Sequence, residues 1–211
     1  MLLSKKHFTP LKWLLVAVFG YLFWLMLQLT LDYIPAKSGI SFLAIKQTEV
    51  SSRPEYLIFF YIHVYSSIFV LLSGFLAMLR KDFGFKNFHK AAGKIYIILI
   101  LVFSAPSGIY MGIFANGGFW AKVSFVLLGV LWWFMTFQAY QLIRQKKFRQ
   151  HQQWMWRSYA LTFSAVTLRL WKVALVYLFQ PAPMDVYQWV AWLGWLPNLI
   201  LAEILISKKL I

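Results

Sequence analysis

Six apolar segments, each about 20 residues long, constrain the fold of this chain more than any other feature. They cover residues 11–31, 56–79, 94–115, 120–143, 158–179 and 188–206. A helix of about 20 apolar residues spans the hydrocarbon core of a bilayer and satisfies its own backbone hydrogen bonds there. The sequence therefore predicts an all-α fold, a polytopic membrane helical bundle with six transmembrane helices.

The small proportion of charged residues excludes a soluble globular domain. The 211 residues are 61% hydrophobic and 13% charged, whereas about a quarter of the residues of a soluble domain are charged. The lack of cysteine excludes disulfides, thiolate metal sites and cysteine nucleophiles. The first segment follows two lysines, as in a signal peptide, but its apolar run is too long and no small-x-small cleavage site follows. We therefore expect residues 1–211 to form a single integral membrane domain that retains this helix.

The charged residues predict which ends of the segments face the cytoplasm. The chain has 21 Lys and Arg against 6 Asp and Glu, a net charge of +15. If the six segments alternate in direction, most of the cations fall on one side, and cytoplasmic loops collect Lys and Arg. The charge thus indicates membrane topology rather than nucleic-acid binding, and both termini are predicted to be cytoplasmic. The cations on that inner side are Lys5, Lys6, Lys12, Arg80, Lys81, Lys86, Lys90, Lys94, Arg144, Lys146, Lys147, Arg149, Arg157, Lys208 and Lys209.

The fifth segment carries two cations inside its apolar run. Arg169 is predicted to lie about 16 Å from the outer helix end, and an ionisable residue at such a depth is a functional-site hypothesis by default. It either contacts an anion or cofactor, or it is bonded to backbone carbonyls or to a buried Asn or Gln. Lys172 is nearer to the helix end, where its side chain can reach the interface by snorkelling.

The second and third segments add polar groups at a similar depth. His63 lies about 10 Å below the predicted outer surface, as a hydrogen-bonded packing residue or as part of a site. Pro106 is expected to kink the third helix and to free backbone carbonyls near this level. Together these features predict an outer polar site formed by His63, Ser107, Tyr110, Arg169 and Lys172.

The sixth segment carries Glu203 near its inner end, at about the predicted level of Arg157. A structural ion pair between these two side chains is the first expectation. A proton-carrying Glu203 is the alternative, because ionisable groups in membranes often take part in proton transfer.

His89 and His151 stand at one predicted depth, each just before an odd-numbered segment on the inner side. If one inserted residue is allowed, both are followed by a basic residue and then by a Tyr, which indicates a faint internal repeat or an ordinary basic and aromatic membrane border. Imidazoles from two helices can be the axial ligands of a haem iron. In this hypothesis Gly93 allows the macrocycle to approach the backbone, and the propionates are neutralised by Lys90, Lys94, Arg149 and Arg157.

The main alternative is that both histidines are interfacial residues without a ligand. A zinc site needs three or four ligands, and Asp82 is the single carboxylate near them in the sequence, so no metal site is assigned. No HExxH, Walker or GxSxG motif is present. No catalytic residue is therefore assigned, and the sequence leaves open whether the protein is an enzyme.

Several short stretches resemble a known family. They are Tyr61-Ile62-His63 and residues 89–96, 105–108, 115–118, 151–169 and 191–199, followed by Glu203. Over roughly residues 56–206 they resemble the predicted bacterial membrane proteins called domain of unknown function 2306. The resemblance implies a helical membrane domain in the bacterial inner (plasma) membrane, without an established activity. Many members have a basic residue after each inner histidine, which Lys90 retains and Gln152 does not.

The arrangement is also similar to transmembrane cytochromes b, which pass electrons between haems held by histidines. Those proteins typically use two histidine pairs on a four-helix core. This chain supplies one pair and the single His63, so a chain of two haems across the membrane is not expected.

Three classes of function follow from the sequence. The first is a membrane redox protein that binds a b-type haem through His89 and His151. The second is a small-molecule or proton transporter that uses His63 and Arg169, which predicts an aqueous cavity reaching Arg169. The third is a non-catalytic membrane subunit, whose 11 Trp and 20 Phe would contact protein partners in the membrane. A metal-dependent membrane hydrolase is a fourth and weaker idea. The predicted surroundings are the lipid bilayer in every case.

Overall fold

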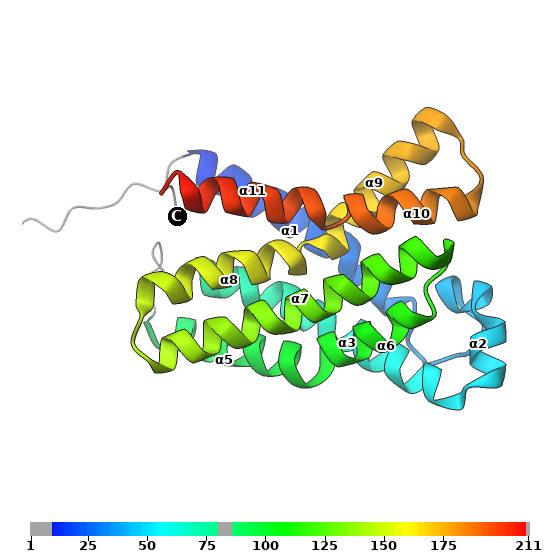
Figure 1. Ribbon diagram of the computed structural model, residues 1–211, viewed down its shortest axis with the longest axis horizontal. Coiled ribbons are helices and arrows are strands. Elements are labelled where there is room, and N and C mark those ends of the chain that lie inside the picture. The colour runs from blue at the N-terminus through cyan, green and yellow to red at the C-terminus, as the bar shows by residue number, and fades with distance from the viewer. Residues whose placement is uncertain (1–9, 80–85, 210–211) are drawn as a thin grey trace, which may run out of the picture.

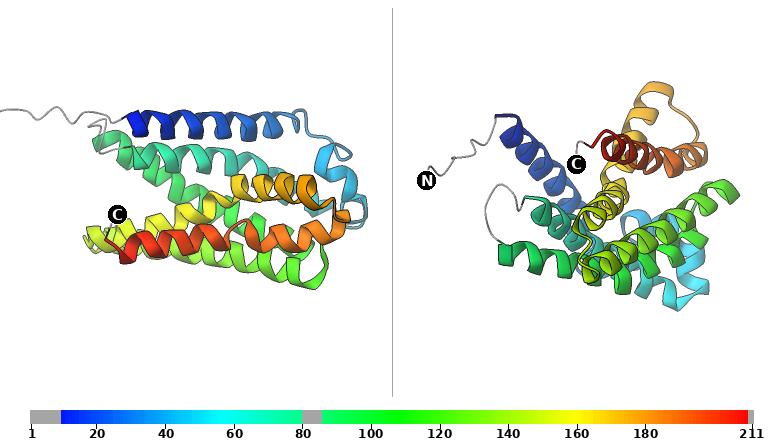
Figure 2. Two further views of the ribbon diagram at one scale, coloured as in Figure 1. Left: turned by 90° about the horizontal axis from the view of Figure 1, so that it is seen from above. Right: turned by 60° about the vertical axis from the view of Figure 1, so that its left-hand side comes forward.

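The computed structural model describes residues 10–79 and 86–209, and every regular element in these ranges is a helix. Six helical stretches in them are long and apolar enough to cross a bilayer, and they run mainly along the bundle, except that the second half of the fifth is inclined away from its long axis (Figures 1 and 2). The predicted six-helix membrane fold is therefore confirmed. The stretches cover Trp13–Leu31, Pro54–Met78, Phe88–Ile113, Gly118–Arg144, Phe148–Phe179 and Met184–Ser207.

Three of these stretches are single helices, and the other three are interrupted. The uninterrupted ones are α1 (Pro10–Leu31), α3 (Pro54–Met78) and α7 (Gly118–Arg144). The third stretch consists of α5 (Lys86–Ile98), the π-helical turn η2 (Leu99–Ser104) and α6 (Ala105–Ile113). The fifth is divided into α8 (Phe148–Thr162) and α9 (Ser164–Phe179), and the sixth into α10 (Pro183–Leu193) and α11 (Leu196–Ser207).

The core of the bundle lies between α3, α5, α7 and α8. Tyr96, Ile100 and Leu161 are almost fully buried there. Small residues let the helices approach closely, as is usual in membrane bundles. At Gly74 of α3, an added Cβ would lie 2.6 Å from the ring of Tyr159 and 2.7 Å from the ring of Tyr96. By contrast, α1 and α9 present many exposed apolar side chains, which suits helices that face lipid.

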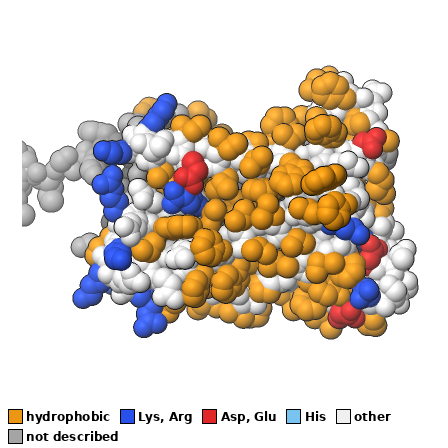
Figure 3. Space-filling model, viewed as in Figure 1, with side chains coloured by type: hydrophobic (Ala, Val, Ile, Leu, Met, Phe, Trp, Pro, Cys, Tyr) orange, Lys and Arg blue, Asp and Glu red, His pale blue; other side chains and the backbone are white. Residues whose placement is uncertain are grey.

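The charges gather at the two ends of the bundle (Figure 3). We call the end where α1 begins and α11 ends the basic end, because Lys and Arg collect around it in Figure 3. The start of α1 and the end of α11 thus lie on the same side of the bundle. Of the cations and acids considered above, Lys5, Lys6, Arg80, Lys81 and Asp82 lie outside the described residues.

The connection from α1 to α3 covers the opposite end with two short helices, η1 (Ser41–Ile45) and α2 (Gln47–Ser52) (Figure 1). It is held by Lys46, whose side chain is only 1% exposed. The ammonium group of Lys46 donates to the Glu49 carboxylate at 2.7 Å and also to the carbonyl of Phe114 after α6. This buried cation therefore fastens the connection to the end of the bundle.

Candidate functional site

Two histidines at the basic-end half of the bundle are held in the same way. His89 of α5 lies with its Nδ1 2.9 Å from the carbonyl oxygen of Ala77 on α3. His151 of α8 lies with its Nδ1 2.8 Å from the carbonyl oxygen of Ala139 on α7. A carbonyl oxygen only accepts hydrogen bonds, so each Nδ1 carries the proton. In the neutral imidazole the Nε2 atom then has a free lone pair, and no hydrogen bond reaches either Nε2 within the described ranges.

These two sites are copies of one unit of structure, 62 positions apart. The Ala77–His89 and Ala139–His151 pairs are each separated by 12 residues. The starts of α5 at Lys86 and α8 at Phe148 have the same offset. The hairpins α3–α5 and α7–α8 are therefore an internal repeat. The sequence pattern requires one inserted residue after the histidines, whereas the histidine–carbonyl bonds and the starts of α5 and α8 share one offset of 62 without an insertion.

The repeated helices face one another at a buried contact. Tyr96 Oη lies 2.8 Å from Ser158 Oγ, and these residues follow His89 and His151 by seven positions each. Seven residues are about two helical turns. His89 therefore lies on nearly the same face of α5 as Tyr96, about 10 Å away along the helix, and His151 lies in the same way relative to Ser158 on α8. Because α5 and α8 run in the same direction, the two imidazoles lie at one level, and they are close enough to interact electrostatically. Both lie inside helices, rather than before them as the sequence predicted.

A hydrogen-bond network extends from this contact. It includes Trp132 and Thr136, neither of which was predicted from the sequence as a site residue. Thr162 Oγ1 lies 2.8 Å from Tyr96 Oη and accepts a 3.0 Å bond from the indole of Trp132. Thr136 Oγ1 lies 2.7 Å from Ser158 Oγ. All of these polar groups are buried, and their mutual bonds offset the cost of removing them from water. The network fixes α5, α7 and α8 relative to one another.

The histidine pair has open space beside Gly93 and exposed cationic side chains nearby. A Cβ added to Gly93, one turn after His89, would meet no atom within 4 Å. The side chains of Lys90, Lys94 and Arg149 are exposed, and none forms an ion pair with an acidic side chain in the described part of the chain. They are therefore available to an anionic group at this end.

Arg157 is not available in the same way. Its Nε and a terminal nitrogen donate to the two oxygens of Glu203 on α11 at 2.5 and 2.8 Å. Its guanidinium also stacks over the ring of Trp154, 4.9 Å from the centroid. The ion pair expected from the sequence is confirmed, and it corrects the assignment of Arg157 to a propionate, because the bidentate Glu203 carboxylate already neutralises this guanidinium.

Pro106 disturbs the third helix as predicted, in the form of the π-helical turn that precedes it. In a π-helix the carbonyl of Leu101 would accept a hydrogen bond from the backbone N–H of residue 106, but proline has no such N–H. The indole of Trp133 donates to this carbonyl instead, at 3.1 Å. At the next turn, His63 Nδ1 lies 2.9 Å from the Ser104 carbonyl, with its ring against Gly108.

The predicted outer polar site is only partly assembled. Ser107 is buried and donates to the carbonyls of Phe103 and Ser104 in its own helix. Tyr110 donates to Glu55 at 2.9 Å at the opposite end of the bundle. Lys172 lies over the ring of Tyr187, 5.3 Å from its centroid. These three side chains are therefore engaged elsewhere, which leaves His63 and Arg169.

Arg169 lies close enough to His63 for its positive charge to act on the imidazole. Its guanidinium donates to the carbonyl of Ala165, one turn earlier in α9, at 2.6 Å. Its side chain is exposed, and no carboxylate of the described residues pairs with it. This bond agrees with the alternative that Arg169 is bonded to backbone carbonyls. However, one carbonyl accepts from only part of the five N–H groups of a guanidinium.

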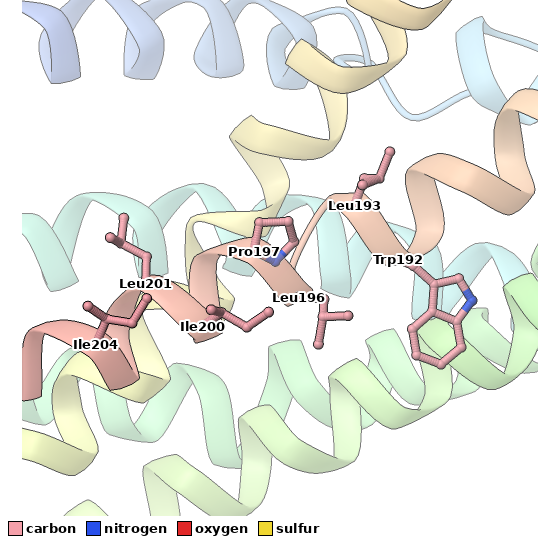
Figure 4. A pocket seen from close by; sticks show the side chains of 7 residues that line it. All are labelled: Trp192, Leu193, Leu196, Pro197, Ile200, Leu201 and Ile204. Carbon is pink, nitrogen blue, oxygen red and sulfur yellow. The ribbon is translucent and has the colours of Figure 1, made fainter. Parts of the chain in front are cut away.

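The interruptions of the fifth and sixth stretches meet at Asn198. Its amide nitrogen lies 3.2 Å from the carbonyls of both Ala160 and Gly194, and 2.9 Å from Thr167 Oγ1. The outward side of the α10–α11 break is a shallow apolar hollow in which Pro197 and Leu196 lie between Trp192 and Ile204 (Figure 4). Apolar side chains alone line this hollow, so it suits an acyl chain or a neighbouring helix and offers no groups for chemistry.

Comparison with known proteins gives one match. A family model described as "Predicted membrane protein (DUF2306)" matches residues 60–206, which includes all three of the histidines discussed above. No curated protein and no solved structure matches the chain.

Proposed function

The chain belongs to the DUF2306 family of predicted membrane proteins, and we propose that within this multi-pass membrane fold it is a redox protein that binds one b-type haem between His89 and His151. The observation that carries the proposal is the pair of Nδ1–carbonyl bonds, at 2.9 and 2.8 Å. Histidines that ligate metals usually donate their second ring N–H to a carbonyl or carboxylate, which fixes the tautomer and the ring orientation. Both imidazoles are thus prepared to bind iron through Nε2.

The number and kind of ligands favour haem over an isolated metal ion. In the described part of the chain no group of three or more His, Asp or Glu side chains could hold a metal ion. Zinc takes four protein or water ligands in a tetrahedron. A haem iron needs only two axial ligands, because its macrocycle supplies the other four nitrogens. His89 and His151, at one level on helices that run in the same direction, would supply these two ligands.

The residues around the pair also suit the macrocycle. The open space at Gly93 permits close approach of a flat group to α5. The exposed Lys90 and Lys94 supply positive charge for two propionates. When bound, haem supplies a one-electron carrier. The protein's part is to hold the iron ligands in one tautomer and to keep the network around Tyr96 closed against water.

The repeat predicts a single haem rather than two. The position equivalent to His63 of α3 is Phe125 of α7, 62 residues later, and phenylalanine cannot ligate iron. His63 therefore has no partner from the repeat. The proposal places the haem near the basic end, and the excess of Lys and Arg there supports a cytoplasmic position for it.

Haem content of the purified protein tests this proposal. Protein expressed in haem-replete cells and purified in detergent is expected to contain about one haem per chain by the pyridine haemochrome assay. A folded, monodisperse preparation without haem would overturn the proposal.

A further inference from the structure

A second site lies in the half of the bundle away from the basic end, around His63 and Arg169. The contact between Tyr159 Oη and the Leu71 carbonyl, at 3.4 Å, sets the relative level of α8 and α3. From there Arg169 is ten residues further along, or about 15 Å, and His63 is eight residues back along the antiparallel α3, or about 12 Å. The two side chains therefore reach similar levels along the bundle, in agreement with the influence of the Arg169 charge on His63.

Ser67 provides an independent sign of a ligand at this level. It lies one turn from His63 on the same face of α3. Its hydroxyl oxygen is buried and has no hydrogen-bond partner, the one such side-chain atom in the described residues. A buried hydroxyl without a partner is costly, and native structures rarely keep one without a reason such as a bound group. The Nε2 atom of His63 is also unbonded there, because the Ser104 carbonyl takes Nδ1.

Arg169 determines the charge of the group that this site suits. It is one cation with an exposed side chain and no carboxylate partner in the described part of the chain. A monoanion balances it, whereas a dianion such as phosphate would leave excess negative charge in a membrane domain. The planar guanidinium matches the two oxygens of a carboxylate.

The depth of Arg169 favours a soluble ligand over a lipid headgroup. Arg169 lies ten residues, about 15 Å, from the end of α9 at Phe179. Because α9 is inclined to the long axis of the bundle (Figure 1), the depth of Arg169 is smaller than this length, but Arg169 still lies inside a spanning stretch, whereas lipid phosphates lie beyond its ends. We propose that His63, Ser67 and Arg169 bind a small organic carboxylate, with Arg169 at the carboxylate and with His63 Nε2 and Ser67 Oγ at a neighbouring hydroxyl or carbonyl oxygen.

Glycolate is a suitable probe, because it has a carboxylate and one adjacent hydroxyl. Its binding to the full-length protein in zwitterionic lipid nanodiscs is measured by isothermal titration, with sodium chloride at equal ionic strength as the reference. Arg169→Gln is compared with Lys172→Gln, which removes the same charge from the same helix. We expect millimolar binding to the wild type and to Lys172→Gln, and at least about tenfold weaker binding to Arg169→Gln.

Ser67→Ala provides the second variant. Because the hydroxyl has no partner in the protein, its removal is expected to leave the thermal midpoint unchanged or raised, while glycolate binding weakens severalfold. Equal binding to wild type and Arg169→Gln would overturn the proposal, and so would the lack of glycolate binding to folded wild type at tens of millimolar. Neither outcome depends on haem at His89 and His151, so the two proposals can fail separately.

Discussion

The hydroxyl of Tyr96 lies 2.8 Å from that of Ser158, and the two residues occupy equivalent positions of the repeated hairpins. This contact joins the two halves of the repeat at the centre of the bundle. It also sets the position of α5 relative to α8 along the bundle. Because His89 and His151 precede Tyr96 and Ser158 by the same two turns, they lie at one level. The buried network is thus the structural reason why two histidines 62 residues apart form a pair.

The packing of Gly74 against Tyr96 and Tyr159 predicts a large effect of a single added methyl group. In Gly74→Ala the new Cβ would lie 2.6–2.7 Å from two buried rings, so one of the rings or α3 itself must move. We expect a loss of about 1–3 kcal/mol in stability, seen as a lower midpoint of thermal unfolding in detergent. Gly20→Ala in α1 is the control, because no atom lies within 4 Å of its added Cβ. Equal midpoints for the two variants would contradict the packing described here.

The Lys46–Glu49 pair predicts a dependence of stability on acid pH. Burial disfavours ionisation of Glu49, but the hydrogen bond from Lys46 and the charges of Lys46 and Lys122 outweigh it, and the pKa falls below its ordinary value of 4.5. A carboxyl group with a lowered pKa stabilises the fold fully above its unfolded pKa, and this contribution disappears as the pH falls through the folded pKa. Acidification from about pH 6 to about pH 3 should therefore destabilise the wild type more than Glu49→Gln.

Thermal midpoints across this pH range measure the effect. Asp32→Asn is the matched control, since Asp32 is exposed and forms no side-chain bond in the structure. It should keep the pH dependence of the wild type. If Glu49→Gln kept it as well, the link between Lys46 and Glu49 would not stabilise this end of the bundle.

The orientation of the bundle can be tested with single cysteines, because the chain has none of its own. Thr48 of α2 and Ser207 at the end of α11 are both exposed and lie at opposite ends of the bundle. If the basic end is cytoplasmic, a membrane-impermeant maleimide should label Thr48→Cys in intact spheroplasts, and Ser207→Cys only after permeabilisation. The reverse pattern would invert the topology.

The membrane fold could be predicted because length and apolarity alone select a spanning helix. The interruptions could not. The break at Phe163 has no proline or glycine, and it depends on Asn198 and Thr167, which bind the carbonyls around it from two helices. At the α10–α11 break a local signal was present, because Gly194 and Pro197 are typical of a helix end and a helix start.

Site residues could be predicted where the position of a side chain in its own helix is sufficient. They could not be predicted where contacts with other helices determine the role of the side chain. His89 and His151 could be selected because ionisable groups at a membrane border are conspicuous. Ser107 and Tyr110 were predicted to belong to the outer polar site, but the hydroxyl of Ser107 bonds to a backbone carbonyl and that of Tyr110 to Glu55. Thr136 and Trp132 stand in an apolar run, where a single hydroxyl or indole usually indicates packing, and only the fold brings them to Tyr96 and Ser158.

The reduced-minus-oxidised visible spectrum of purified variants shows whether His89 and His151 hold a haem. His63→Ala is a stringent control, because its imidazole is also anchored through Nδ1 to a backbone carbonyl but has no partner histidine in the repeat. We expect the Soret and α bands of a b-type haem in the wild type and in His63→Ala. The same bands should be lost in His89→Ala and in His151→Ala, each checked for monodispersity and thermal midpoint. Bands that persist in folded His89→Ala and His151→Ala protein, or that are missing from folded wild type, would show that this histidine pair does not bind haem.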